Sequence, residues 1–216
     1  MRRSLLVVFA ACVAVPLASQ APMPIGVGIS ASTMGIGVDG AVQVMPRIGL
    51  RGRLAFMPYK PKFTVSGIEY EMELPSPQAG LFADVFLVGG LRVTGGLRYS
   101  SKGLSASGVI PGTVTIGDST YSGSEIGTWS GAITTKKLAP YLGLGFGRVA
   151  GHGLGIFFDA GVAFHGTPTV TFSADGPIAS QAQFQTELAK EQADANDSIS
   201  SVTIYPVIAL GLRYGF

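Results

Sequence analysis

Residues 202–216 read VTIYPVIALGLRYGF, and their side chains alternate strictly in character. Every second residue from Val202 to Phe216 is apolar, whereas the residues between them are mostly small or polar and include Arg213. Successive side chains of a β-strand point to opposite faces, so this stretch would present one wholly apolar face. The pattern predicts a membrane strand with one face toward lipid and the other toward a crowded, partly polar interior.

Further segments upstream alternate in the same way, at 25–30, 34–44, 48–56, 81–87, 91–99, 138–147 and 154–165. A Gly-Leu-Arg tripeptide ends at Arg51, Arg92, Arg98 and Arg213, and the strand phase turns each Leu outward and each Arg inward. Past the first 21 residues no stretch has the roughly 18 consecutive apolar residues of a membrane helix. Closed barrels are the other structure that satisfies every backbone group in lipid. We therefore expect an all-β, antiparallel up-and-down transmembrane β-barrel of about eight strands.

A soluble sandwich with one buried face is the competing interpretation of these strands. It would leave Gly and Arg to dominate the solvent faces. It would also leave the composition unexplained, because 13% charged residues, 31 Gly and 47% apolar residues are unusual for a soluble domain.

The N-terminus has the layout of a secretory signal peptide. Two arginines precede an apolar run that ends at Val15, and small residues follow up to Ala21. We divide the chain into a signal peptide, 1–21, and an outer-membrane β-barrel domain, 22–216. The alternative is a lipoprotein processing site ending at Cys12, but the apolar run continues past that residue.

Charge and cysteine content exclude several classes of function. Removal of the two arginines of the signal would leave 13 of the 15 Lys and Arg against 13 Asp and Glu, which makes a neutral chain. A neutral chain offers no basic footprint for nucleic acid. Cys12 is the only cysteine and would leave with the signal, so we expect neither a disulfide nor a cysteine-based metal site, and no cofactor.

Connections between the predicted strands are alternately tight and long. The tight set is 45–47, 88–90 and 149–153, and the long set is 59–76, 101–135 and 173–201. If the long set lies outside the cell, both ends of the barrel domain lie in the periplasm. Apolar residues between Ala182 and Ala193 recur at near-helical spacing, which predicts a short acidic helix in the last surface loop, capping the barrel mouth.

Eight charged residues are expected to point into the barrel: Asp39, Arg51, Arg53, Asp84, Arg92, Arg98, Asp159 and Arg213. An eight-strand barrel is narrow enough for side chains to fill it. We interpret these residues as a network of salt bridges that plugs the lumen, since buried charges need partners. The alternative is a selectivity lining in a narrow pore. Counting back from the turn at 45–47 places Asp39 opposite Arg53.

Four segments carry a resemblance to a known family: GIGVDG at 35–40, MPRIGLRG at 45–52, LAPYLGLG at 138–145 and GLRYGF at 211–216. They resemble small outer-membrane β-barrel proteins, namely the transmembrane domain of the outer-membrane protein A type and opacity-like surface proteins. The terminal Phe and the apolar residues before it look like the signal read by the barrel-assembly machinery: Ile208, Leu210, Leu212, Tyr214 and Phe216. The resemblance implies the outer membrane of a Gram-negative bacterium. The partners that the resemblance implies are outer-membrane lipid, lipopolysaccharide and the barrel-assembly machinery. We expect the protein to be a monomer.

Three functions from different classes stay open. We favour a non-enzymatic surface or structural barrel, serving envelope integrity, adhesion or contact with a host or the environment, because we find no catalytic or metal-binding set. The second is a narrow channel for small solutes or apolar ligands. The third is a lipid A-modifying enzyme that would use His165 with a loop serine. The segment at 35–40 also matches the dinucleotide fingerprint, but no helix opens after it, so nucleotide binding is not expected.

Overall fold

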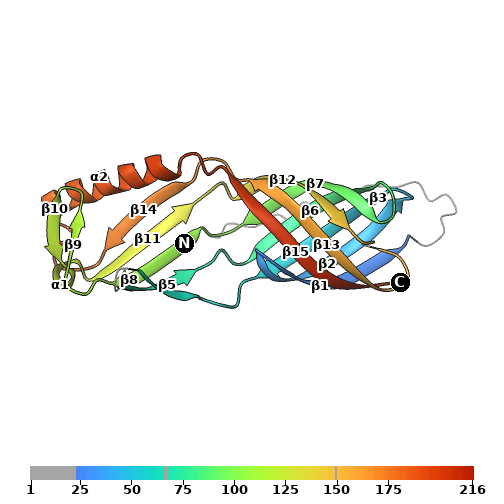
Figure 1. Ribbon diagram of the computed structural model, residues 1–216, viewed down its shortest axis with the longest axis horizontal. Helices are drawn as coiled ribbons and strands as arrows, with labels where there is room; N and C mark the ends of the chain where they lie inside the picture. The colour runs from blue at the N-terminus through green and yellow to red at the C-terminus, as the bar shows by residue number, and fades with distance from the viewer. Residues whose placement is uncertain (1–22, 66–67, 149) are drawn as a thin grey trace, which may run out of the picture.

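Eight antiparallel strands close into a barrel in the order β1-β15-β13-β12-β7-β6-β3-β2. The structure, a computed structural model, describes residues 23–65, 68–148 and 150–216, so the predicted signal peptide lies outside the described residues. Strands that follow one another round the barrel also follow one another along the chain, which confirms the predicted up-and-down barrel (Figure 1). The barrel strands are β1 (Ile25–Ser32), β2 (Gly35–Met45), β3 (Ile48–Phe56), β6 (Gln78–Phe86), β7 (Leu91–Ser100), β12 (Leu138–Phe146), β13 (Gly153–Phe164) and β15 (Ile204–Gly215).

The outer surface of the barrel is an apolar band. In all four Gly-Leu-Arg tripeptides the Leu is exposed and the Arg is buried, as in Leu50 and Arg51 with 43% and 3% of their surface exposed. Exposed aromatic side chains border the band, with Tyr99 and Phe164 toward one end and Phe146 toward the other. Such a band, flanked by aromatic girdles, is typical of a barrel surrounded by lipid.

The two ends of the barrel differ in their connections. At the turn end, Pro46 and Arg47 join β2 to β3, and residues 87–90 join β6 to β7. The first and the last described residues also lie at this end. At the loop end, Thr33 and Met34 join β1 to β2, and three long connections leave the barrel, namely 57–77, 101–137 and 165–203. The alternation of tight and long connections therefore agrees with the sequence pattern.

The three long connections pair with one another to form a second sheet beyond the loop end, in the order β14-β11-β8-β5-β4. Figure 1 shows this sheet continuing away from the barrel along the long axis of the molecule. We call it the outer sheet, and its strands are β4 (Lys62–Val65), β5 (Ile68–Glu73), β8 (Leu104–Val109), β11 (Thr128–Thr134) and β14 (Thr169–Ala174). A separate hairpin, β9 (Thr113–Ile116) and β10 (Ser119–Ser122), leads into the one-turn helix α1 (Gly123–Ile126).

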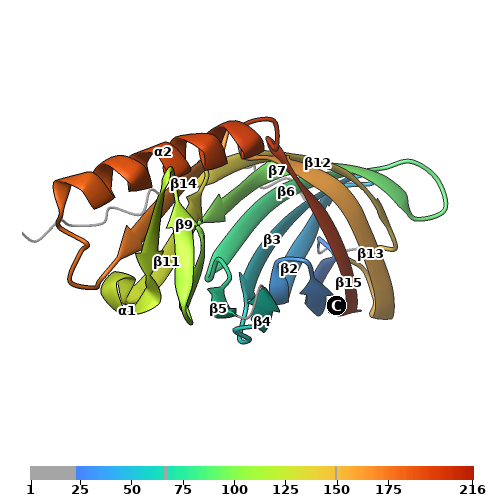
Figure 2. The same cartoon turned by 60° about the vertical axis from the view of Figure 1, so that its left-hand side comes forward.

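The predicted helix of the last long connection is present as α2 (Ala182–Ile199). Its position corrects the expectation of a cap over the barrel mouth: α2 lies along β14 and beside β9 (Figure 2). The reason is its apolar side, where Phe184 and Leu188 are buried against Ile116 and Ile126 of the hairpin region. Neither helix of the described part is long and apolar enough to cross a bilayer.

Candidate functional site

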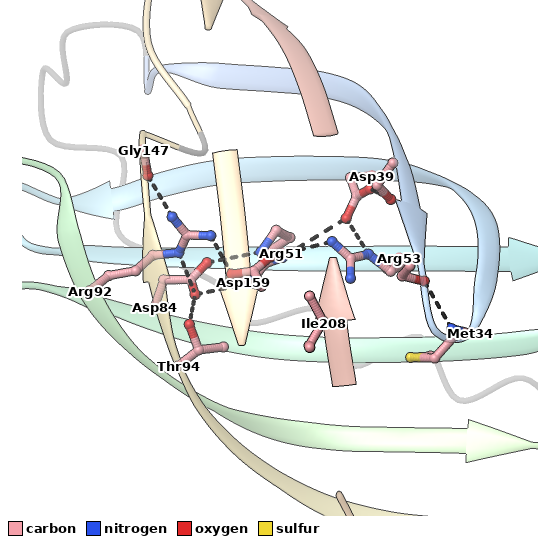
Figure 3. Close-up of polar contacts among 12 residues, drawn as sticks. Met34, Asp39, Arg51, Arg53, Asp84, Arg92, Thr94, Gly147, Asp159 and Ile208 are labelled. Atoms are coloured by element: carbon pink, nitrogen blue, oxygen red, sulfur yellow. Dashed lines mark hydrogen bonds and ion pairs between the residues drawn. The ribbon is translucent and has the colours of Figure 1, made fainter. Parts of the chain in front are cut away.

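Six of the charged residues predicted to face inward meet in the middle of the barrel: Asp39 of β2, Arg51 and Arg53 of β3, Asp84 of β6, Arg92 of β7 and Asp159 of β13. All six are buried, with at most 7% of their surface exposed. Three arginines face three aspartates, so the set is neutral as a whole. We call it the lumen network, and Figure 3 shows it in close-up.

Asp159 is the hub of the lumen network. Its carboxylate accepts hydrogen bonds from Arg51 Nη1 at 2.7 Å, from Arg53 Nη2 at 3.4 Å and from Arg92 Nη2. Strands β3 and β13 are four positions apart in both directions round the closed ring, so the contacts of Arg51 and Arg53 with Asp159 run across the lumen, whereas Arg92 reaches Asp159 from β7, two positions away. Side chains from opposite walls therefore touch at the barrel axis.

Asp84 forms the second centre of the network. It accepts hydrogen bonds from Arg51 Nε at 3.1 Å, from Arg92 Nε at 3.3 Å and from Thr94 Oγ1 at 2.6 Å. Arg92 also donates to the carbonyl of Gly147 at 2.5 Å. With several charge-assisted bonds each, these buried groups have the partners that burial demands.

Asp39 and Arg53 are the pair expected from the short turn after β2. The register places them directly opposite each other, and Arg53 Nε donates to Asp39 Oδ1 at 2.6 Å. The hydroxyl of Ser30 donates to the other carboxylate oxygen at 2.6 Å. The prediction counted from a three-residue turn at 45–47, whereas in the structure Met45 pairs with Ile48 across two residues. A register shift between Gln43 and Met45 supplies the extra residue in β2, so Asp39 still lies opposite Arg53.

Glycines on the inner wall make room for these large side chains. A Cβ atom on Gly145 of β12 would lie 2.5 Å from Arg92 Cζ and 2.6 Å from Asp159 Oδ1. A cavity beside Asp39 and Arg51 measures about 10 Å³, which is about the smallest volume that accepts one water molecule. The lumen is therefore filled by side chains at the level of the network.

Arg98 and Arg213 face inward as expected but stand apart from the lumen network. Among the described residues, neither takes part in an ion pair, and the Nε of each has no hydrogen-bond partner. Arg98 donates from Nη2 to Gln78 Oε1 at 2.6 Å, and Arg213 donates from Nη1 to the carbonyl of Gly151 at 3.4 Å. Alternation fixes the face of a residue but not its height along the axis, and these two lie toward opposite ends of the barrel.

A cavity of about 330 Å³ opens at the loop end, between the barrel and the outer sheet. We call it the mouth cavity. Its walls are mostly apolar and come from three parts of the fold: the barrel strands, the start of the outer sheet and the residues around the end of α2. They include Met57, Leu74, Leu104, Ile133, Ala139, Ile199, Val202 and Tyr205. This cavity could not be predicted from the sequence, because its lining comes from connections that are far apart along the chain.

The face of β15 predicted as an assembly signal is exposed on the outside of the barrel. Its residues are Ile208, Leu210, Leu212, Tyr214 and Phe216, each with about half of its surface exposed. The backbone N–H of Phe216 donates to the carbonyl of Ile25 at 3.0 Å, where β15 meets β1 and the barrel closes. This face thus points outward from the barrel and ends at the seam where the barrel closes.

The histidine of the enzyme alternative lies just after β13. The ring Nδ1 of His165 is 2.9 Å from the carbonyl of Gly166, its immediate neighbour in the chain. Across residues 23–65, 68–148 and 150–216 there is no group of three His, Cys, Asp or Glu side chains that could hold a metal ion.

The closed eight-strand barrel, its apolar band and its extended loop end define the fold of a small outer-membrane β-barrel protein. CarO2 from Acinetobacter baumannii has a similar structure, with a TM-score of 0.61 and 20% identity over 90% of this chain and 99% of that one. CarO from the same organism gives a TM-score of 0.58 and 18% identity over 89% of this chain and 98% of that one. No protein-family model matches the sequence, and no curated protein matches it either.

Proposed function

We propose that the protein is a closed barrel of the outer membrane of a Gram-negative bacterium and acts as a non-enzymatic surface protein. In this proposal the barrel is an anchor, and the outer sheet with α2 is the part that meets a host or the environment. The lumen network carries the proposal, because six interlocked charged side chains fill the lumen at mid-height. A barrel filled in this way is suited to hold a structure outside the membrane rather than to pass solutes.

The remaining parts of the proposal concern location and partners. Export would use the predicted signal, 1–21, and insertion would use the apolar face of β15 as the signal for the barrel-assembly machinery. The protein would then stand as a monomer among lipid and lipopolysaccharide, as a relative of the outer-membrane protein A type and opacity-like barrels. The exposed apolar band supports the placement in lipid.

Single-channel recording in planar bilayers tests the closed lumen. The refolded protein, with its folding shown by its slower migration before boiling in gel electrophoresis, is expected to give no steady conductance steps. A large porin reconstituted in the same way supplies the positive control. Reproducible steps would overturn the closed barrel and favour the second candidate, a narrow channel for small solutes or apolar ligands.

Labelling of intact cells tests which end faces outward. Since the mature chain is expected to lack cysteine, single cysteines can be introduced as Ser124→Cys at the far end of the outer sheet and as Arg47→Cys at the turn end. Both side chains are exposed. A membrane-impermeant maleimide is expected to label the first variant on intact cells and the second only after the outer membrane is permeabilised. The reverse labelling result would contradict the surface role.

Mass spectra of lipid A from cells that overexpress the protein test the non-enzymatic role. Altered lipid A would contradict it.

A further inference from the structure

The mouth cavity has the size and surface of a ligand site. Its volume of about 330 Å³ lies at the lower end of the roughly 300–1,000 Å³ found for small-molecule sites. Its walls are mostly apolar, with aromatic surface from Tyr205 and aliphatic surface from Ile133 and Ile199. A cavity of this size and character suits one alkyl chain of medium length but is too small for a lipid with several chains.

Arg98 gives this cavity an unsatisfied charge. Its side chain lines the cavity and is buried, with 8% of its surface exposed. Gln78, a neutral partner, accepts one hydrogen bond, and the guanidinium carbon lies 5.6 Å from the centre of the Tyr205 ring. The Arg98 Nε has no partner among the described residues. A buried cation without a counter-ion is costly, so an anion that reached it would relieve that cost.

The other charged side chains of the described lining are also cationic. Lys102, Lys136 and Lys137 join Arg98 around the cavity, and no Asp or Glu is found among its described lining residues. The three lysines are exposed and therefore form a rim rather than a wall. A ligand would thus meet cationic groups on entry and an arginine inside, which selects for anions.

Arg213 shows that an unpaired buried arginine does not by itself make a ligand site. It is buried to a similar degree and also has an unpartnered Nε among the described residues. The cavity beside it measures only about 10 Å³, so no organic ligand fits there. Within the described part of the chain, an unpaired buried arginine and a roomy apolar cavity coincide only at Arg98.

We infer that the mouth cavity binds a single-chain amphipathic anion, with its alkyl chain against the apolar walls and its carboxylate or phosphate head on Arg98. The planar guanidinium favours such heads because it can donate two parallel hydrogen bonds. The inference goes beyond the proposed function and does not depend on the closed lumen, since the cavity lies above the lumen network. The conductance test of the closed lumen and a binding test of the mouth cavity can therefore give negative results independently of each other.

Energy transfer to a fluorescent fatty-acid analogue tests this inference. Trp129 is the only tryptophan of the chain, and it lies on β11, the strand that contributes Ile133 to the cavity. The probe is 11-(dansylamino)undecanoate, added to the refolded barrel in phosphatidylcholine vesicles, so that Trp129 is the only tryptophan in the sample. We expect saturable energy transfer from Trp129 to the dansyl group, over the background from probe dissolved in lipid. Absence of a saturable component would overturn the inference.

Competition identifies the head group. Dodecanoate or dodecyl phosphate, or both, should displace the probe, and the stronger competitor shows whether a carboxylate or a phosphate is preferred. Dodecanol, with the same chain and no charge, should compete at least about tenfold more weakly, because a charge-assisted bond is lost. Equal competition by dodecanol would mean that the cavity is merely apolar and would overturn the role of Arg98.

Matched variants locate the site. Arg98→Gln is expected to weaken binding of the probe by about tenfold or more, whereas Arg213→Gln, which removes the other unpaired arginine, should leave binding unchanged. Lys136→Glu adds a test that does not disturb the folded core, because this side chain is exposed, and it should weaken binding measurably. If Arg213→Gln and Arg98→Gln weaken binding equally, or if Lys136→Glu and Arg98→Gln both bind normally, the site is not the mouth cavity.

Discussion

Replacement of Asp159 by Asn is the sharpest test of the lumen network. The amide has nearly the shape of the carboxylate, so packing is preserved while one negative charge is removed. Three arginines would then face two aspartates in a space closed to bulk water. In addition, the new NH₂ group would be a donor placed among guanidinium donors, so at least one hydrogen bond would be lost.

The expected loss is large on the scale of folding free energies. Asp159 receives Arg51 Nη1 at 2.7 Å and a second close bond from Arg92 Nη2. Removal of one partner of a buried ion pair typically lowers the free energy of unfolding by about 3–5 kcal/mol. Total stabilities are about 5–15 kcal/mol, so Asp159→Asn should lower the urea midpoint of the refolded barrel substantially.

The assay is urea unfolding of the refolded barrel in lipid vesicles, followed by its gel mobility before boiling. Asp118→Asn is the matched control: it removes an aspartate of an exposed ion pair with Lys190, and such pairs contribute little. Adding Arg51→Gln to Asp159→Asn restores equal numbers of charges, so the double variant should be more stable than the sum of the two single losses implies. An unchanged midpoint for Asp159→Asn would refute the view that the network holds the barrel together.

Three further predictions concern other parts of the fold. Deletion of Phe216 should lower the fraction of protein that is inserted into the outer membrane of cells. Stability after refolding in vitro should stay nearly unchanged, because the exposed Phe216 side chain packs little. Normal insertion in cells would count against an assembly signal. Gly145→Ala should lower the free energy of unfolding by about 1–3 kcal/mol in the same urea assay, because the added Cβ would press on the lumen network. Gly95→Ala is the control and should have little effect, because nothing lies within 4 Å of the added Cβ. Equal effects of the two variants would contradict this account. Glu187 accepts the backbone N–H of Asp118 at 2.7 Å, and this bond, followed by the contact with a lysine, lowers the pKa of its carboxyl group. The folded state therefore favours the ionised carboxylate, so the attachment of the β9–β10 hairpin to α2 should hold near neutral pH and loosen as pH falls below about 4, measured by hydrogen exchange of the hairpin. Glu187→Gln should weaken this dependence, and the remainder should come from Asp118, whose pKa is also lowered by its ion pair with Lys190; an unchanged dependence would contradict the role of Glu187.

Much of the barrel could be predicted because its determinants are local. The side of the wall on which Arg51 or Arg92 lies follows from counting along one strand. The pairing of Asp39 with Arg53 depends on a tight turn together with the one-residue register shift between Gln43 and Met45. The hub role of Asp159 could not be found in this way. It depends on β13 standing opposite β3, and that distance round the ring is fixed only when β1 and β15 pair and the barrel closes.

The outer sheet was harder to predict for a related reason. Residues 101–135 are rich in Gly, Ser and Thr and lack a strong alternation of apolar residues, so they indicated a loop. In the structure they supply β8 and β11, which lie in the middle of the outer sheet between strands from the other two long connections. Backbone hydrogen bonds between distant segments, rather than local side-chain pattern, make these residues strands.

The sequence by itself therefore determined the class of fold, the phase of each barrel strand and the side on which each charged residue lies. These properties follow from alternation at a period of two and from short turns, which act within a few residues. Tertiary structure decided which charged side chains meet across the lumen and which strands α2 packs against. It also decided that the Arg98 side chain lines an apolar cavity. Those outcomes depend on heights along the barrel axis and on contacts between connections far apart in the chain, which exist only once the ring is closed.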